Sequence, residues 1–368
     1  MLRQTAVLAV SVLSQAACAQ GLDVWAAHSS AWVMNSDGTS VLGAAPGVCV
    51  WNRDRGFVQY DEMVGSFAMY TLTGISEDGT RITGSAIDTN DPNPILRQRA
   101  FQSSGFGTMR LLPSLGGAFA SEARGVSGDG EIVVGMSGNR SFSVGEACIW
   151  VGGGPARGLG RLRPATDLAS RCSAISRDGT TVVGTSRGFD LGSAFRWTAA
   201  EGMTALADPA GTAFGGSALC VNGSGDLIGG DTGDSRACLW RDGVGEIIGG
   251  AGTSVTSVSD RGEVILGMGW EFNRPDAVIF RLNGTELLID YLRGLGNTFE
   301  PTTRISSASV SGDGRTICGR LIDPLGESHG FVATIPSAPG SAVLLFGVVA
   351  RRPSRPRSAC PRGVAARC

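Results

Sequence analysis

Few residues in this sequence could carry catalysis, and they are widely spaced. The two histidines, His28 and His329, stand near opposite ends of the chain. A metal site at this pair would need carboxylates from other strands, and no metal-ligand spacing surrounds either histidine. We therefore predict no metal, no cofactor and no catalytic residue, and we expect both histidines in solvated loops.

The tyrosines are the other possible nucleophiles. A sialidase-like glycosidase would need an arginine cluster beside a tyrosine, and Tyr60, Tyr70 and Tyr291 stand in no such setting. The Asp-box turn S-x-D-x-G-x-T-W is also absent, because here aspartate directly precedes glycine. Aspartates at these positions form turns more readily than they bind calcium; they are Asp37, Asp78, Asp129, Asp178 and Asp313.

These aspartates belong to a hairpin-like unit that occurs seven times, at 33–43, 75–84, 126–135, 175–184, 221–230, 258–267 and 310–319. Each copy has a turn glycine: Gly38, Gly79, Gly130, Gly179, Gly225, Gly262 and Gly314. A second glycine follows five residues later in every copy: Gly43, Gly84, Gly135, Gly184, Gly230, Gly267 and Gly319. Asp-Gly between alternating apolar residues favours a two-residue hairpin loop with positive φ at both central residues.

An aromatic residue closes a short apolar strand in each copy: Trp51, Phe101, Trp150, Trp197, Trp240, Phe280 and Phe331. Most of these strands are followed by a glycine-rich turn and a strand rich in leucine, so each unit holds four short strands, A to D. Repeats of this length with four strands are typical of β-propeller blades. The seventh copy lacks strand D, whereas the strand at 22–26 precedes the first strand A.

We therefore predict an all-β, seven-bladed β-propeller of four-stranded antiparallel blades, with the ring closed by the mature N-terminal strand. An eight-bladed ring is the alternative. The predicted propeller covers residues 20–335, with repeats at about 27–64, 68–115, 120–163, 170–208, 215–249, 253–293 and 304–335 plus 21–26. No stretch after the first twenty residues has sustained helical periodicity.

Segments such as 112–135 (LPSLGGAFASEARGVSGDGEIVVG) and 193–197 (SAFRW) resemble the bacterial extracellular HAF-repeat proteins. The His-Ala-Phe triplet of that family survives only as Arg99-Ala100-Phe101, Ser193-Ala194-Phe195 and His329-Gly330-Phe331. The resemblance covers roughly residues 22–335. It implies an exported propeller of unassigned activity, and it supplies no catalytic residues to transfer.

The two ends predict export. Arg3, a short apolar run and the small residues before Gln20 are typical of a signal peptide at 1–19. Cys18 would be acylated in a lipoprotein, but Gln15 stands where that motif needs an aliphatic residue. Residues 336–352 resemble a PEP-CTERM-type sorting segment, and 353–368 form a basic tail that we expect to be disordered. A plain disordered tail over the whole of 336–368 is the alternative.

Composition limits the partners. The net charge is −2 and glycine accounts for 56 of 368 residues. A chain with this charge has no general attraction to nucleic acid, and tight turns explain the glycine.

Cys49, Cys148 and Cys238 occupy one equivalent position of the repeat. We therefore expect them to be small core residues rather than disulfide partners.

The irregular sequences lie between strands B and C, at the end of the blades opposite the A–B turns. There we predict an exposed rim of aromatic and cationic residues for a binding partner: Arg140, Phe142, Arg187, Phe189, Trp270, Phe272 and Arg274. The neighbouring D–A loops add Phe119, Phe214 and Phe299. The alternative is that these aromatic side chains fold back onto the blades.

The sequence thus predicts an exported or cell-surface protein, with transient membrane contact only through the C-terminal segment before sorting. We expect it to act as a non-catalytic binding or structural module, not as an enzyme, through one irregular face. Its expected partner is a glycan or an envelope or matrix protein, and not nucleic acid. The alternative is a carbohydrate-active propeller enzyme, which a pocket holding paired carboxylates about 5–10 Å apart would favour.

Overall fold

A computed structural model describes residues 22–44, 48–59, 63–90, 98–103, 108–117, 120–139, 143–189, 192–212, 215–271, 274–281 and 284–335. The predicted signal peptide, with Cys18, and the segments 336–352 and 353–368 lie outside the described residues. Within the described ranges no helix has the length and apolar character needed to cross a bilayer.

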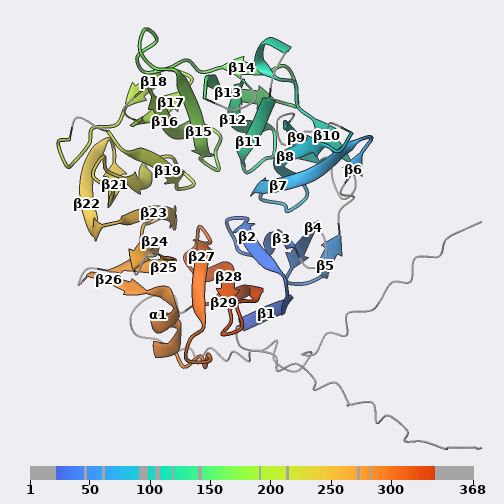
Figure 1. Ribbon diagram of the computed structural model, residues 1–368, viewed down its shortest axis with the longest axis vertical. Coiled ribbons are helices and arrows are strands. Elements are labelled where there is room, and N and C mark those ends of the chain that lie inside the picture. Colours follow the sequence, from blue (N-terminus) through green and yellow to red (C-terminus); the bar gives the residue numbers. More distant parts are fainter. Residues whose placement is uncertain are drawn as a thin grey trace, which may run out of the picture.

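The chain is all-β, and its strands form antiparallel groups set around a common centre (Figure 1). The first group is β2 (Ser30–Met34), β3 (Ser40–Ala44), β4 (Val48–Asn52) and β5 (Gly56–Gln59). The second is β6 (Met63–Val64), β7 (Phe67–Ile75), β8 (Ile82–Asp88), β9 (Arg99–Ser103) and β10 (Met109–Leu111). In each group the first long strand lies nearest the centre, as β2 and β7 do here.

The third and fourth groups join into one eight-stranded sheet through a single parallel pair, Gly145 with Ala169. The third is β11 (Ala120–Val126), β12 (Ile132–Gly138), β13 (Gly145–Val151) and β14 (Arg157–Gly158). The fourth is β15 (Ala169–Ile175), β16 (Thr181–Arg187), β17 (Gly192–Thr198) and β18 (Gly202–Ala205).

The fifth group is β19 (Ser217–Val221), β20 (Leu227–Asp231), β21 (Arg236–Arg241) and β22 (Val244–Ala251). The sixth is β23 (Thr253–Val258), β24 (Ile265–Glu271), β25 (Arg274–Arg281) and β26 (Gly284–Leu287). The last is β27 (Arg304–Val310), β28 (Thr316–Ile322) and β29 (Ser328–Thr334), completed by β1 (Leu22–Ala27).

Strand β1 therefore pairs with β29, as the sequence predicts for residues 22–26. The register sets Leu22 opposite Ala333 and Val24 opposite Phe331. Trp25 is buried in a cluster formed by the first and last groups, where it packs with Val41, Cys49, Cys318 and Val332. Strand β2 also contacts β28 directly, so residues from the two ends of the described chain share one core.

One short helix departs from the all-strand prediction. Strand β26 ends at Leu287, and α1 (Leu288–Gly294) follows it within the predicted sixth repeat. Leu288, Ile289 and Leu292 are buried in the core beside β27 and β28. The prediction of strands alone after the first twenty residues is therefore wrong here, because three apolar residues at helical spacing are buried on one face.

The second glycine of each repeat lies opposite or next to a β-bulge in the neighbouring inner strand. In β11 the bulge lies between Ala123 and Gly125, opposite Gly135 of β12. A Cβ added at Gly135 would overlap the carbonyl oxygen of Glu122. A backbone oxygen of the inner strand blocks the corresponding glycine in every repeat in the same way. The glycine spacing seen in the sequence therefore reflects close backbone approach at a bulge.

The A–B turns differ from the two-residue loops that we predicted. All seven turn glycines have positive φ, between 68° and 79°, but the aspartates before them do not. In the third group Gly130 N–H donates to the Ser127 carbonyl, and Ser127 N–H donates to the Ile132 carbonyl, which makes a four-residue loop. The Ser127 hydroxyl donates to Asp129 (2.5 Å), whose carboxylate also accepts from Glu131 N–H (2.9 Å). These side-chain bonds stabilise the longer loop, a type I turn followed by the glycine.

The equivalent cysteines Cys49, Cys148 and Cys238 are buried in the cores between neighbouring groups, as predicted. Burial raises the pKa of the Cys148 and Cys238 thiols, which keeps them protonated and apolar.

Candidate functional site

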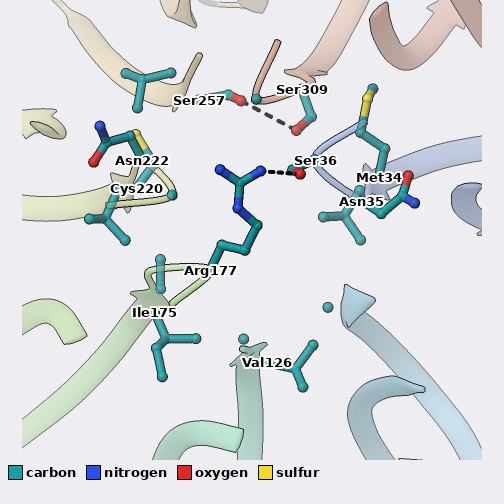
Figure 2. Close-up of a pocket in the computed structure, with 18 of the residues that line it drawn as sticks. Met34, Asn35, Ser36, Val126, Ile175, Arg177, Cys220, Asn222, Ser257 and Ser309 are labelled. Carbon is teal, nitrogen blue, oxygen red and sulfur yellow. Dashed lines mark hydrogen bonds between the residues drawn. The ribbon is translucent and has the colours of Figure 1, made fainter. Parts of the chain in front are cut away.

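The inner strands of all seven groups line a central cavity of about 290 Å³. Its wall carries hydroxyl groups from several of these strands, including Thr73, Ser173, Thr256 and Ser309, and the side chain of Arg124. The Ser257 and Ser309 hydroxyls lie 3.3 Å apart across neighbouring strands (Figure 2). The cavity lies between the inner-strand bulges and the A–B turns.

Arg177 crosses the axis at the A–B end of this cavity. Its guanidinium extends toward the opposite wall and donates to the Ser36 hydroxyl (Figure 2). The other terminal nitrogen, Nη2, donates to Asp260 Oδ2 at 2.6 Å. One arginine of the fourth group thereby links the first and sixth groups.

Two carboxylates complete this polar cluster. Glu77 accepts from the Ser36 N–H at 3.1 Å and from the Ser36 hydroxyl at 2.5 Å. Asp260 Oδ1 accepts from Gly223 N–H at 2.9 Å. Both carboxylates are thus held by hydrogen bonds from neighbouring groups.

All of these residues occupy the same position of the A–B turn, the one after its first Ser or Asn. The seven occupants are Ser36, Glu77, Gly128, Arg177, Gly223, Asp260 and Gly312. The glycines leave the space that the charged side chains use. A Cβ at Gly128 would lie 2.6 Å from Arg177 Cγ, and one at Gly312 would lie 2.7 Å from Asp260 Oδ2.

Hydrogen bonds also connect the turns in a circuit. Five of these bonds run from a main-chain N–H to a main-chain carbonyl oxygen: Gly312 to Ser36, Glu77 to Gly128, Gly128 to Arg177, Asp178 to Gly223 and Asp260 to Gly312. Asn35 and Asn222 side-chain amides donate to the Glu77 and Asp260 carbonyls at 2.8 Å and supply the two remaining links. Our sequence analysis missed this cluster, although one signal was available: this turn position holds glycine in three copies and Glu77, Arg177 or Asp260 in three others.

The predicted rim lies at the other end of the strands. Phe189 and Trp270 are 86% and 63% exposed, and Arg187 and Arg274 are also exposed. Phe189 follows β16 and Trp270 lies in β24, with the β19–β22 group between them (Figure 1). The structure therefore exposes these residues on two separate groups and does not bring them into one cluster.

The other predicted rim residues fall into two sets. Arg140, Phe142, Phe272, Phe119 and Phe214 lie outside the described residues. Phe299 is half-buried against the core around α1 and β27, so the prediction that it adds an exposed aromatic is wrong. That core contains the buried apolar residues Leu292 and Ile305, and packing against it removes part of the Phe299 side chain from water.

His329 is not the solvated loop histidine that we expected. It lies half-buried in β29, with Nδ1 3.3 Å from the Trp25 carbonyl oxygen and Nε2 3.3 Å from Asp323 Oδ2. Asp323, Glu327 and His329 place one possible metal ligand each within 4.8 Å of one another, a grouping that our search for metal motifs missed. Asp323 Oδ1, however, already accepts from Leu325 N–H (2.9 Å) and Glu327 N–H (2.8 Å) in a tight turn.

The other residues considered for chemistry, and not predicted to carry it, lie apart. His28 is exposed with φ 64° in the turn after β1, Tyr70 is exposed in β7, and Tyr60 lies outside the described residues. Tyr291 is in α1, with the Arg281 guanidinium 4.5 Å from its ring centre. Burial raises the pKa of the Tyr291 hydroxyl, which makes it a weaker nucleophile at neutral pH.

No family model and no curated protein matches this chain. Among solved structures, the propeller domain of the trilobed protease from Pyrococcus furiosus aligns with a TM-score of 0.46 and 10% identity, over 71% of this chain and 79% of that one. TolB from Acinetobacter baumannii aligns with a TM-score of 0.44 and 11% identity, over 83% and 63%. Pyrococcus horikoshii acylaminoacyl peptidase gives 0.46 and 13%, over 77% of this chain and 48% of the peptidase. At these values none of the three bears on function, and this chain spans less than two thirds of the last two.

Proposed function

We propose that this protein is an exported, non-catalytic binding module of the HAF-repeat type, built as a closed seven-bladed propeller that binds its partner at the loop end. Seven antiparallel groups, the pairing of β1 with β29 and the circuit of turn hydrogen bonds support the closed ring. The proposed partner is a glycan or an envelope or matrix protein.

The observation that carries the binding proposal is the exposure of two aromatic rings at the loop end, whereas the charged side chains on the axis at the A–B end bond to one another and to Ser36. At the A–B end, Arg177 donates across the axis to Ser36 and Asp260, and the Ser36 hydroxyl donates to the neighbouring Glu77. At the loop end, by contrast, the large apolar side chains of Phe189 and Trp270 lie in solvent. Exposed aromatic residues beside arginines are typical anchors of binding surfaces.

Substitution of the exposed aromatics tests this proposal. The purified protein would be screened on a glycan array and in pull-downs from envelope fractions, beside the variants Trp270→Ala and Phe189→Ala. We expect Trp270→Ala to weaken binding of the partner found by about 2 kcal/mol, as for other aromatic anchors, with unchanged thermal unfolding.

Arg261→Ala is the matched control, because Arg261 lies at the A–B end and 85% of its side chain is exposed. Equal loss of binding in this control would place the interface elsewhere. Unchanged binding in both aromatic variants would contradict the proposed face.

Export has its own test. N-terminal sequencing of protein recovered from the periplasm or medium should begin at Gln20, with no lipid on Cys18. Protein that keeps Met1, or a lipidated Cys18, would contradict the proposed processing.

A further inference from the structure

Positive charge is concentrated in one sector of the molecule. Although the net charge of the chain is −2, the segment 157–187 holds six arginines against Asp167 and Asp178. This segment runs from β14 through β15 and β16, so the charge belongs to the third and fourth groups.

Two of these arginines lie on one face of the fourth group, toward its loop end. The register pairs Ala169 with Arg187 and Arg171 with Thr185. Residues 169 and 171 point to the same face of β15, so Arg171 and Arg187 are diagonal neighbours on adjacent strands. Both side chains reach the surface.

The arginines around them are already engaged. Arg163 Nε lies 2.9 Å from Asp167 Oδ1, and Arg124 Nε lies 2.9 Å from Glu122 Oε1. Arg161 donates to the Gly145 carbonyl oxygen at 3.3 Å. Neither Arg171 nor Arg187 forms an ion pair with a described residue, so this face carries an excess of positive charge.

The pKa of Arg171 agrees with an excess of positive charge on this face. Neighbouring atoms desolvate its guanidinium and lower its pKa, and the positive charges of Arg124 and Arg187 lower it further, against the opposing effect of Glu122. A bound anion would remove this repulsion, since an opposite charge nearby favours the charged form of a group.

We propose that Arg171 and Arg187 bind carboxylate groups of an acidic polysaccharide, a polyuronate, while the exposed Phe189 packs against a sugar ring. Guanidinium groups bind planar carboxylates through two parallel hydrogen bonds, and Phe189 lies two residues beyond Arg187, just after the end of β16. Duplex DNA fits less well, because its binding needs an extended positive surface and this chain is net negative. The inference rests on the proposed function, since it uses the same loop end.

Binding of the full exported chain to alginate tests this inference, with dextran as a neutral polysaccharide and heparin and duplex DNA as other polyanions. We expect Arg187→Gln to weaken alginate binding about 10-fold and Arg171→Gln/Arg187→Gln about 100-fold, as for lost charge-assisted hydrogen bonds. Arg187→Lys, which keeps the charge and loses the planar fork, should also weaken it. Arg261→Gln, at the opposite end, should change it less than 2-fold. Circular dichroism and urea unfolding would show that each variant is folded.

Each outcome decides the inference. Selective alginate binding that falls in the Arg187 variants supports it. Equal binding of DNA or heparin, no binding of alginate, or an equal loss in Arg261→Gln would overturn it. If alginate fails but another ligand loses affinity through Trp270→Ala, the polyuronate assignment is wrong and the binding face stands. If no loop-end substitution affects any ligand, the proposed function itself fails.

Discussion

The two ends of the strand groups use the same repeat in opposite ways. At the A–B end, seven turns share one loop length and positive φ at the same glycine, and hydrogen bonds link each turn to the next. At the loop end the connections differ in length and sequence, and Phe189 and Trp270 lie in solvent. A turn that must fit its neighbours on both sides tolerates little change, whereas a loop that faces solvent can vary.

Variation in amino-acid type at the regular A–B end also has a structural role. At one of the turn positions that change from copy to copy, the charged residues Arg177 and Asp260 pair across the axis, and the glycines at that position give them space. Regularity in the sequence therefore marks the structural end, and a break in that regularity marks a specific interaction.

The largest expected effect comes from removing the strand that joins the first and last groups. Deletion of residues 20–27 would leave β29 unpaired and remove the buried Trp25. We expect the free energy of unfolding to fall by at least the 3–5 kcal/mol typical of deleting a buried tryptophan side chain. Urea unfolding measures this, with Trp25→Ala as the milder variant. A loss below about 1 kcal/mol would show that the hydrogen bonds between the A–B turns hold the first and last groups together without β1.

A smaller effect is expected in the strands that run between the two ends. Gly135→Ala would place a Cβ against the backbone of Glu122, which cannot move without disturbing the bulge. We expect a loss of about 1–3 kcal/mol in urea unfolding, as for other overpacked sites. Gly250→Ala is the control, because open space surrounds that glycine in β22. If both variants were equally stable, close approach at the bulge would not explain the second glycine.

Much of the fold could be predicted because the same sequence pattern occurs seven times. Turn glycines, alternating apolar residues and closing aromatics defined strands A to C, and the missing strand D of the last copy indicated where β1 pairs. The loop length was wrong because the Ser127–Asp129 bond, a side-chain interaction, stabilises the longer turn. Helix α1 was missed because the helical conformation of Leu288, Ile289 and Leu292 depends on their packing against β27 and β28. Such tertiary contacts override local propensity and cannot be read from the segment itself.

The candidate sites were less predictable. The end at which Phe189 and Trp270 lie followed from alternating strand directions, since antiparallel strands send successive loops to opposite ends. Their exposure did not follow from the sequence, because the rings could also have folded back onto the blades. The Arg177–Asp260 pair joins residues of the fourth and sixth groups, and only the curvature of the whole assembly brings them together. The contact of His329 with the Trp25 carbonyl oxygen, by contrast, depends on the β1–β29 pairing that the sequence did predict.

The axial ion pair should contribute modestly to the stability of the A–B end. Arg177 and Asp260 are each partly exposed, so we expect a coupling free energy of at most about 1 kcal/mol in a double-mutant cycle of Arg177→Gln and Asp260→Asn. The coupling should shrink in 1 M salt, because screening weakens exposed charges. The pair Arg196–Glu201, within one hairpin, provides a comparison cycle. A coupling no larger than in that pair would remove the special role of the axis.

The smallest expected effect is a difference in the pH dependence of stability between the two ends. At the A–B end, hydrogen bonds from the Ser127 hydroxyl and the Glu131 N–H lower the pKa of Asp129. At the loop end of β20, burial raises the pKa of Asp231 against hydrogen bonds from Ser217. A carboxyl whose pKa is lower in the folded state adds stability above its unfolded pKa, and this is lost as the pH falls through the folded value. A raised pKa has the opposite sign, because the buried charge is a cost at neutral pH that protonation removes.

Asp129→Asn should therefore reduce stability most near pH 6 and converge with the unsubstituted protein in acid. Asp231→Asn should increase stability near pH 6, and this gain should disappear as the pH falls through the folded pKa of Asp231. Urea unfolding from pH 2 to 6 measures both profiles, and each difference should be smaller than the losses expected for the β1 deletion and Gly135→Ala. Profiles of the same sign would mean that both carboxylates have similar surroundings, and the electrostatic contrast between the turn end and the loop end would be lost.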